Sequence, residues 1–268
     1  MKEKVKSIID PEFRKKFDVL FCFGDRHYPH HDEKTDSIVL QLISDLKPDI
    51  VIDGGDMIDA HAISVFAKSP ESSRGIADQI KGDKTWRSKI NAIVPGAKKI
   101  VLYDNHFCRR LDDFLKRPDT WWLSEFNCMS IDNLFQFSDT SWELLDDWIW
   151  KDKFMFMHGD ADGGCSIANP VNKARNMVKR RGIGIVRWHS HGTGVELVNQ
   201  FHGPLHAIQM GIIMDPEKTE YVRHKAVMEA TQSVGVFYLS KQTNDYYFDL
   251  IPIVNHKAAY MFREYLPK

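Results

Sequence analysis

Short apolar runs alternate with longer stretches of mixed polar and apolar residues along most of this chain. We expect the short runs to be buried strands, at residues 18–25, 49–56, 98–106, 153–160 and 182–192. Between them, residues 35–49 have apolar side chains at helical spacing, and residues 168–182 end at Gly182, a plausible helix stop. Strands that alternate with helices predict an α/β fold.

The C-terminal part of the chain has a different pattern, with strands and few helical stretches. Residues 206–215 and 233–254 predict strands, with a turn near Thr243, Asn244 and Asp245. We therefore expect a motif-bearing core at 18–194 and a β-rich part at 195–268. A chain of 268 residues is long enough to bury a sizeable core, and we interpret residues 1–268 as a single domain.

Each of the five N-terminal runs ends in Asp, His or Asn. In α/β sheets, ligands bind at the carboxyl ends of the strands, so these side chains are candidates for one shared site. They are Asp25, His27, Asp56, Asn105, His106, His158, His189 and His191. This set of nitrogen and oxygen donors without a thiolate suits manganese, iron or zinc. The alternative is structural: Asp25 and Asp56 as turn residues, and His158 as a hydrogen-bonded core histidine.

The sequence WHSH at 188–191 places two imidazoles one residue apart at the end of a strand. On an extended backbone, side chains two residues apart point to the same face. Neutral imidazole is the commonest metal ligand among side chains. We therefore expect His189 and His191 to face one cavity and to bind two different ions.

Taken in order, five motifs resemble those of the calcineurin-like metallophosphoesterase superfamily. They are GDRH (24–27), GDMID (55–59), DNHF (104–107), MHGD (157–160) and WHSH (188–191). Each motif is weak alone, but five in the family's order, each at a strand end, are specific. The resemblance implies a four-layer sandwich of two mixed β-sheets flanked by helices, with a dinuclear metal centre at one edge.

The resemblance also implies a role for each residue of the candidate site. The first ion would be held by Asp25, His27, Asp56 and His191, and the second by Asp56, Asn105, His158 and His189. Asp56 would bridge two divalent ions, manganese in first place, with iron, zinc or nickel as alternatives. A hydroxide bridging the ions would attack phosphorus. His106, beside Asn105, would assist the leaving group.

The chain departs from the family pattern at three positions. The family has an acidic residue after GNH that orients the catalytic histidine, and here Phe107 stands in its place. Asp104 replaces the glycine of that motif and could substitute as the partner of His106. Trp188 replaces the glycine before HxH, where it could pack beneath the ligands or narrow the cleft. Asp59 is expected to cap or orient rather than to bind metal.

The predicted activity is hydrolysis of a phosphate mono- or diester by a metal-dependent phosphoric ester hydrolase. Substrate contacts are assigned to His61, Arg109 and Trp188. A first alternative is a nuclease or nucleotide phosphodiesterase. It would use the tryptophans of residues 120–150, which otherwise form a helical hairpin packed on the sheet. It would also use the basic cluster at Lys173, Arg175, Lys179, Arg180, Arg181 and Arg187, which otherwise is a solvated helix face. A second alternative is a non-catalytic metal-binding scaffold.

Charge, cysteine content and hydropathy indicate the compartment of the protein and the classes of partner that it can bind. The net charge is −1, so no overall field favours nucleic acid or a membrane surface, although nucleic acid stays open as a substrate. The four cysteines form no CxxC pair, which fits a reducing compartment. The charged N-terminus has no apolar signal region, and no run reaches the roughly 20 apolar residues of a spanning helix. We therefore expect a cytoplasmic protein with a phosphate-ester substrate and no membrane partner. Oligomeric state and physiological substrate are not determined by the sequence.

Overall fold

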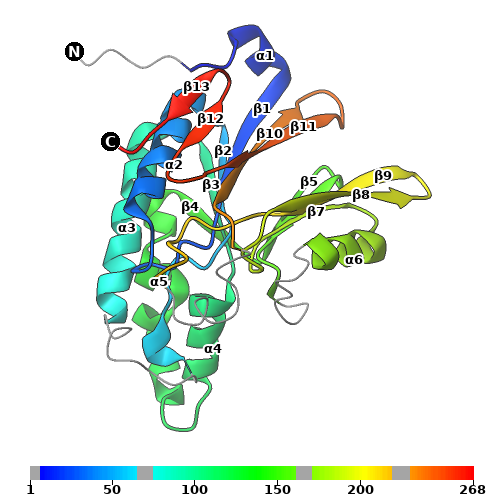
Figure 1. Cartoon of the computed structure of the whole chain (residues 1–268). Helices are drawn as coiled ribbons and strands as arrows, with labels where there is room; N and C mark the ends of the chain where they lie inside the picture. The colour runs from blue at the N-terminus through cyan, green and yellow to red at the C-terminus, as the bar shows by residue number, and fades with distance from the viewer. Residues whose placement is uncertain (1–6, 65–74, 161–170, 219–229) are drawn as a thin grey trace.

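The computed structural model describes residues 7–64, 75–160, 171–218 and 230–268. Within them the chain forms two mixed β-sheets that face each other, with helices on their outer sides (Figure 1). This architecture is the predicted α/β sandwich. The hydrophobic cluster between the sheets includes Leu20, Ile52, Phe156 and Phe237, which come from strands of both sheets.

The first sheet has six strands in the order β11-β10-β1-β2-β3-β4. Their bounds are β1 Phe17–Phe23, β2 Ile50–Asp53, β3 Lys98–Leu102, β4 Trp142–Leu145, β10 Ser233–Ser240 and β11 Tyr246–Pro252. Strands β1 to β4 run parallel, and β10 pairs antiparallel with β1. The C-terminal strands thus complete the sheet that the N-terminal motifs begin. The β10–β11 turn encloses Thr243, Asn244 and Asp245 as predicted.

The second sheet has five strands in the order β5-β6-β7-β9-β8. Their bounds are β5 Asp147–Trp150, β6 Phe154–Met157, β7 Gly184–Arg187, β8 Gly194–Gln200 and β9 Gly203–Gln209. Strands β6, β7 and β9 are parallel, so their carboxyl ends meet at one edge. The predicted strand 206–215 begins earlier and ends at Gln209, and strand β8 was not predicted.

Helices cover the outer face of each sheet. Helices α2 (Glu33–Leu46) and α3 (Ile76–Ile93) lie on the first sheet, and α6 (Val171–Arg181) lies on the second (Figure 1). The buried face of α2 includes Ile38, Val39, Leu42, Ile43 and Leu46, at the spacing that predicted it. Its N-cap is Asp32, whose side chain accepts hydrogen bonds from Lys34 N and Thr35 N, so the helix begins before the predicted start.

Short helical elements occupy the remaining connections. They are α1 (Pro11–Lys16), the 3-10 turn η1 (His61–Ile63), the π-helical turn η3 (Asn105–Arg109), α4 (Arg110–Leu115), the 3-10 turns η4 (Trp121–Glu125), η5 (Asn127–Met129) and η6 (Ser138–Thr140), and α5 (Ile131–Phe135). A small hairpin of β12 (Ala258–Tyr260) and β13 (Arg263–Tyr265) lies near the end of the chain. None of the helices in the described ranges is long and apolar enough to cross a membrane.

The predicted helical hairpin at 120–150 is wrong. The segment forms the three 3-10 turns η4, η5 and η6 and the five-residue helix α5, followed by strands β4 and β5. Its indoles divide between core and surface: Trp142 and Trp150 are buried, whereas Trp121 and Trp122 are 54% and 49% exposed. The buried tryptophans of this segment therefore belong to the edge strands β4 and β5, and not to one face of a helix.

The basic cluster is spread along helix α6 and into strand β7 rather than gathered on one surface beside the candidate site. Helix α6 connects the parallel strands β6 and β7, so it runs from the carboxyl edge of the sheet to the opposite edge. Lys179, Arg180 and Arg181 are in its last turn and therefore lie far from the strand ends that carry the histidines. Arg187 is buried and donates from Nη2 to Gly159 O. The end of α6 is therefore a solvated face, whereas Arg175 pairs with Glu196 and Arg187 is a core arginine.

Candidate metal centre

Loops from both sheets meet at the carboxyl ends of β1, β2, β3, β6 and β7. The β1 and β2 loops are joined by backbone hydrogen bonds, from Asp25 N to Gly55 O (2.9 Å) and from His27 N to Asp56 O (2.8 Å). The second sheet is tied to them by His189 N, which donates to Asp25 Oδ2 at 3.1 Å. Parallel strands explain why motifs far apart in sequence meet at this edge.

The backbone at the candidate ligands is strained. Asp25, His27, Asp56, His189 and His191 all have positive φ, between 47° and 73°. Non-glycine residues in this region cost roughly 1–3 kcal/mol each, and they persist only where the surrounding structure holds them in place. Left-handed backbone at most of the candidate ligands indicates a site selected for side-chain placement rather than for stability.

Two groups of ligand atoms result, buried apart from the half-buried His189, and they share one carboxylate. Asp25, His27, Asp56 and His191 form the first group, and Asp56, His158 and His189 form the second. The ligand atoms within each group lie within 4.8 Å of one another. Asp56 Oδ2 stands 3.5 Å from His27 Nε2 of the first group and 3.4 Å from His158 Nε2 of the second. The structure thus brings together the residues that the resemblance assigned to two ions.

His189 and His191 belong to different groups of ligand atoms. The extended backbone that was predicted at these residues is wrong. Residues 188–192 are not extended: Ser190 N donates to Trp188 O and Gly192 N donates to Ser190 O. Both imidazoles project from left-handed positions of this tight turn. The His189 ring lies 5.2 Å from the His158 ring, and the His191 ring lies 5.4 Å from the His27 ring, measured between centroids.

The donor set fits divalent cations. Asp25 Oδ1 and Asp56 Oδ2 are buried, and neither accepts a hydrogen bond from any residue that the structure describes. A buried carboxylate oxygen without a donor is costly unless a cation satisfies it. Imidazole and carboxylate ligands without sulfur match zinc, manganese or iron rather than a structural thiolate site. The buried His and Asp groups can therefore hold metal ions.

The pKa values of the candidate ligands are shifted by burial and by their charged neighbours. Burial lowers the pKa of His189 to about 3, with His158 adding to the effect, so His189 is neutral at pH 7, and neutral imidazole is the form that binds a cation. Burial acts against the charge on His158 too, but Asp56 and Asp25 raise its pKa to about 10. Burial also raises the pKa of Asp25, to about 7. With a pKa of about 10, His158 is protonated at pH 7, and its positive charge neutralises the Asp56 carboxylate. A bound cation would neutralise the same carboxylate in its place.

Asn105 joins the second group through its side-chain oxygen. His158 Nε2 lies 2.9 Å from Asn105 Oδ1, and His158 Nδ1 lies 2.8 Å from Gly54 O. The backbone carbonyl fixes Nδ1 as the proton donor and directs Nε2 toward the centre, as outer-shell partners of ligating histidines do. A neutral asparagine adds an oxygen ligand without further negative charge.

His106 has a carboxylate partner that was not assigned from the sequence. Its Nδ1 lies 3.1 Å from Asp59 Oδ1, and its Nε2 lies 3.9 Å from Asp56 Oδ2. Burial alone would raise the pKa of Asp59, but hydrogen bonds with His106 and His27 lower it far below the ordinary range. Asp59 thus orients His106, as the acid after GNH does in the family pattern, although it also lies near His27 and could join a third group of ligands.

Asp104 does not take that part. Its Oδ1 accepts from Phe107 N and Cys108 N, which caps the turn η3, and its Oδ2 accepts from Asp56 N at 2.9 Å. It therefore holds the backbone of Asp56 rather than the ring of His106. Phe107 is buried and packs on Phe135.

Trp188 is fully buried, so the predicted substrate contact at this residue is wrong. Its indole fills the space over Gly24 and Gly54, where an added Cβ would come within 2.6 Å and 2.2 Å of the ring. These two glycines directly precede the DxH and GD motifs. The indole therefore packs beneath the metal-binding loops, the first of the two placements that the sequence left open.

The other two predicted substrate contacts lie at the rim of the centre. His61 is partly exposed, with Nδ1 3.9 Å from Asp59 Oδ2. Arg109 pairs with Asp160 at 2.7 Å. Arg109 also lines a pocket of about 200 Å³ together with Asn105, Arg110 and Arg117. Arg110 and Arg117 were not predicted, and the RRLDDFLKR sequence offered no motif that would have marked them.

Comparisons with known proteins give only distant similarities. No family model matches the chain. The Gene 54 protein of Mycobacterium phage D29 is 23% identical over 250 residues, which are 90% of this chain and 95% of that protein. Vacuolar protein sorting 29 of Cryptosporidium parvum aligns with a TM-score of 0.46 at 12% identity, over 94% of this chain and 99% of that one. Vps29 of Entamoeba histolytica, solved as a complex with zinc, aligns with a TM-score of 0.36 at 8% identity, over 87% and 98%. The chemistry of the site therefore rests on the residues of this chain.

Proposed function

We propose that this protein is a dinuclear metal-dependent phosphoesterase. The observation that supports this most is the sharing of Asp56 between two buried ligand groups, with His106 beside them and Asp59 behind it. Asp25, His27 and His191 would hold one ion with Asp56, and Asn105, His158 and His189 would hold the other. Two divalent cations, when bound, would neutralise phosphate charge and lower the pKa of a nucleophilic water.

The chain's own residues supply the remaining chemistry. The Asp59 carboxylate fixes the ring of His106 through Nδ1, which leaves Nε2 facing the centre. From there His106 can give a proton to the leaving oxygen. The guanidinium groups of Arg109, Arg110 and Arg117 border the pocket beside Asn105, where they can bind anionic oxygens of the substrate. We further propose manganese as the working metal and the cytoplasm as the compartment.

The test is hydrolysis of bis-p-nitrophenyl phosphate and p-nitrophenyl phosphate by metal-stripped protein after addition of manganese. Turnover that depends on manganese and disappears in Asp56→Asn supports the proposal, and the faster substrate tells a diesterase from a monoesterase. Metal binding without turnover of either substrate would contradict it and would favour the non-catalytic scaffold.

The arginine pocket supports a second candidate, a nuclease or nucleotide phosphodiesterase. Three guanidinium groups next to Asn105 suit a substrate with a further phosphate near the scissile one. The measurement is cleavage of thymidylyl-thymidine with and without a 5′-phosphate. A preference for the phosphorylated dinucleotide that Arg117→Gln removes would support this candidate. Equal rates would show that the arginines do not bind the 5′-phosphate, and no cleavage of either dinucleotide would contradict this candidate and leave a phosphatase of small esters.

A further inference from the structure

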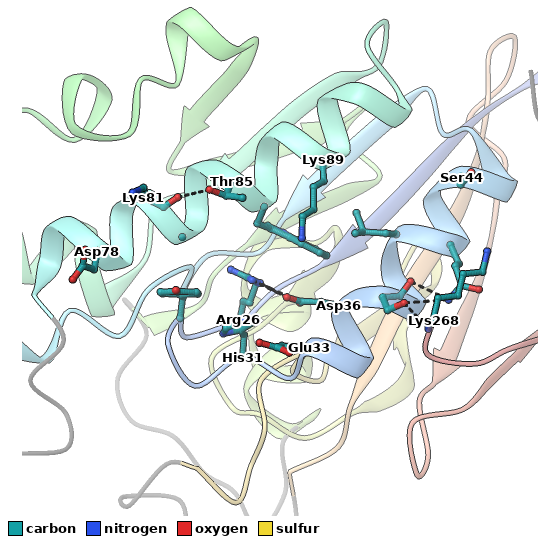
Figure 2. A pocket seen from close by; sticks show the side chains of 16 residues that line it. Arg26, His31, Glu33, Asp36, Ser44, Asp78, Lys81, Thr85, Lys89 and Lys268 are labelled. Atoms are coloured by element: carbon teal, nitrogen blue, oxygen red, sulfur yellow. Dashed lines mark hydrogen bonds and ion pairs between the residues drawn. The ribbon is translucent and has the colours of Figure 1, made fainter. Parts of the chain in front are cut away.

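A groove of about 960 Å³ lies between helices α2 and α3, on the outer side of the first sheet (Figure 2). Its lining combines apolar, polar and charged side chains, and the charged ones include the carboxylates of Glu33, Asp36 and Asp78 as well as basic groups. Ser37, Gln41 and Ser44 come from α2, and Thr85 and Lys89 come from α3. This volume is at the upper end of the range for small-molecule sites. The groove contains none of the residues assigned to the metal centre.

Arg26 lies on the wall of this groove and is almost fully buried, at 4% exposure. Its Nε and Nη2 donate to the carboxylate of Asp36, with Nη2 2.7 Å from Oδ2. The guanidinium also lies over the ring of Trp86, 4.7 Å from its centroid. One side of the guanidinium is therefore satisfied, whereas Nη1 has no hydrogen-bond partner in the described part of the chain.

Trp86 contributes a second donor of the same kind. It lines the groove, is 2% exposed, and its Nε1 has no hydrogen-bond partner among the described residues. A buried donor left unpaired costs about 1–3 kcal/mol. Two such donors on one groove indicate that an acceptor belongs there, either water or the oxygens of a ligand.

The lysines favour a negatively charged ligand. Lys89 extends from α3 toward the Arg26–Asp36 pair (Figure 2), and Lys81 lines the same groove. Within the described residues, no carboxylate lies at ion-pair distance from either ammonium group, whereas Asp36 is already paired with Arg26. Phosphate offers oxygens in several directions, which suits the donors that Arg26, Trp86 and Lys89 bring to one groove.

We infer that this groove binds an organic phosphate, separately from the metal centre. The phosphate occupies the end formed by Arg26, Trp86 and Lys89. The hydroxyl and amide groups of Ser37, Gln41 and Ser44 contact the polar body of the ligand. Sugar phosphates and nucleotides share this chemistry, and the groove is large enough for either.

Calorimetric titration of the full chain with ADP, glucose 6-phosphate and inorganic phosphate, without added divalent cation, tests this inference. We expect one saturable site for at least one organic phosphate, with inorganic phosphate binding more weakly. The organic ligand that binds tightest tells a nucleotide site from a sugar-phosphate site. Trp86→Phe keeps the aromatic ring and removes one donor, so it should weaken binding about two- to tenfold. Lys89→Met should weaken binding about tenfold or more.

The matched control is Lys84→Met, on the same helix but outside the groove, which should change affinity less than about twofold. Asp56→Asn should also leave this binding unchanged, which separates the groove from the metal centre. Thermal unfolding of Trp86→Phe confirms that the variant is folded. The inference is overturned by an absence of binding at millimolar ligand, by loss of binding in Asp56→Asn, or by equal effects of Lys84→Met and Lys89→Met.

Discussion

Two tripeptides, one from each sheet, build most of the candidate centre. Asp25–Arg26–His27 follows β1, and His189–Ser190–His191 follows β7. The outer residues of both have left-handed backbone, with φ of 52° and 47° in the first and 73° and 62° in the second. The middle residues differ: Arg26 reaches the α2–α3 groove, whereas Ser190 is fully buried and its Oγ has no hydrogen-bond partner in the described ranges.

Because the middle residues differ, the two tripeptides are held in place by different contacts. The first tripeptide is held by a buried ion pair and by Trp86, and so it is linked to a surface groove. The second is held by its own turn and by its hydrogen bond to Asp25. Asp56 lies between them and contacts imidazoles of both sides.

The largest effect is expected from Asp56→Asn, which removes the carboxylate common to both groups. An amide cannot bridge two cations as a carboxylate does, so both ions should be lost. Loss of an outer-shell partner costs about 10–100-fold in activity, and loss of this ligand should exceed that. Manganese content and turnover are the measurements. Asp119→Asn, at an exposed position, is the control, and two retained ions in Asp56→Asn would contradict the shared-ligand assignment.

Next in size is the pair His27→Ala and His189→Ala, which addresses the two groups separately. Each variant should bind one manganese ion per chain instead of two, because His27 and His189 each belong to only one of the two groups that share Asp56. Activity should fall more than about 100-fold in both. Metal analysis after dialysis distinguishes them from Asp56→Asn. If either variant alone lost both ions, the two-group description would be wrong.

The strand-end positions of these ligands could be predicted from sequence, because Gly-Asp and Asn-His after an apolar run mark the carboxyl end of a parallel strand. The backbone conformation could not. An extended HxH places both rings on one face, but the turn at 188–192 directs them to two groups by left-handed φ angles that no local residue preference indicates. Non-glycine residues adopt such angles only where tertiary contacts impose them.

Contacts between segments that are distant in sequence could not be predicted either. Asp59 and His106 are 47 residues apart, and their pairing depends on how the β2 and β3 loops meet. The burial of Trp188 depends on space left by Gly24 and Gly54, which are remote in sequence. Arg110 and Arg117 line the pocket beside Asn105 because a short helix follows the turn η3. Each of these features needs the packed structure.

Asp59→Asn should have a smaller effect, about 10–100-fold on turnover, because His106 keeps its place but loses its carboxylate partner. If His106 protonates the leaving oxygen, the loss should grow as the leaving group becomes more basic. Rates with p-nitrophenyl and phenyl phosphate give this comparison. An equal loss with both substrates would show that Asp59 acts on the metal ligands, through His27, rather than on proton transfer.

The smallest effects are expected from substitutions of the middle residues, Arg26 and Ser190, which compare the two tripeptides directly. Arg26→Lys keeps the charge but loses the forked contact with Asp36, so the loop that carries Asp25 and His27 loses one of its anchors. Manganese affinity should weaken about tenfold, the lower bound for outer-shell changes. Ser190→Ala removes a hydroxyl that makes no hydrogen bond within the described residues, so affinity should change less than about twofold. Competition with a fluorescent chelator measures both. Equal sensitivity of the two variants would mean that the β7 turn also depends on its middle residue, and the asymmetry between the two sides of the centre would not hold.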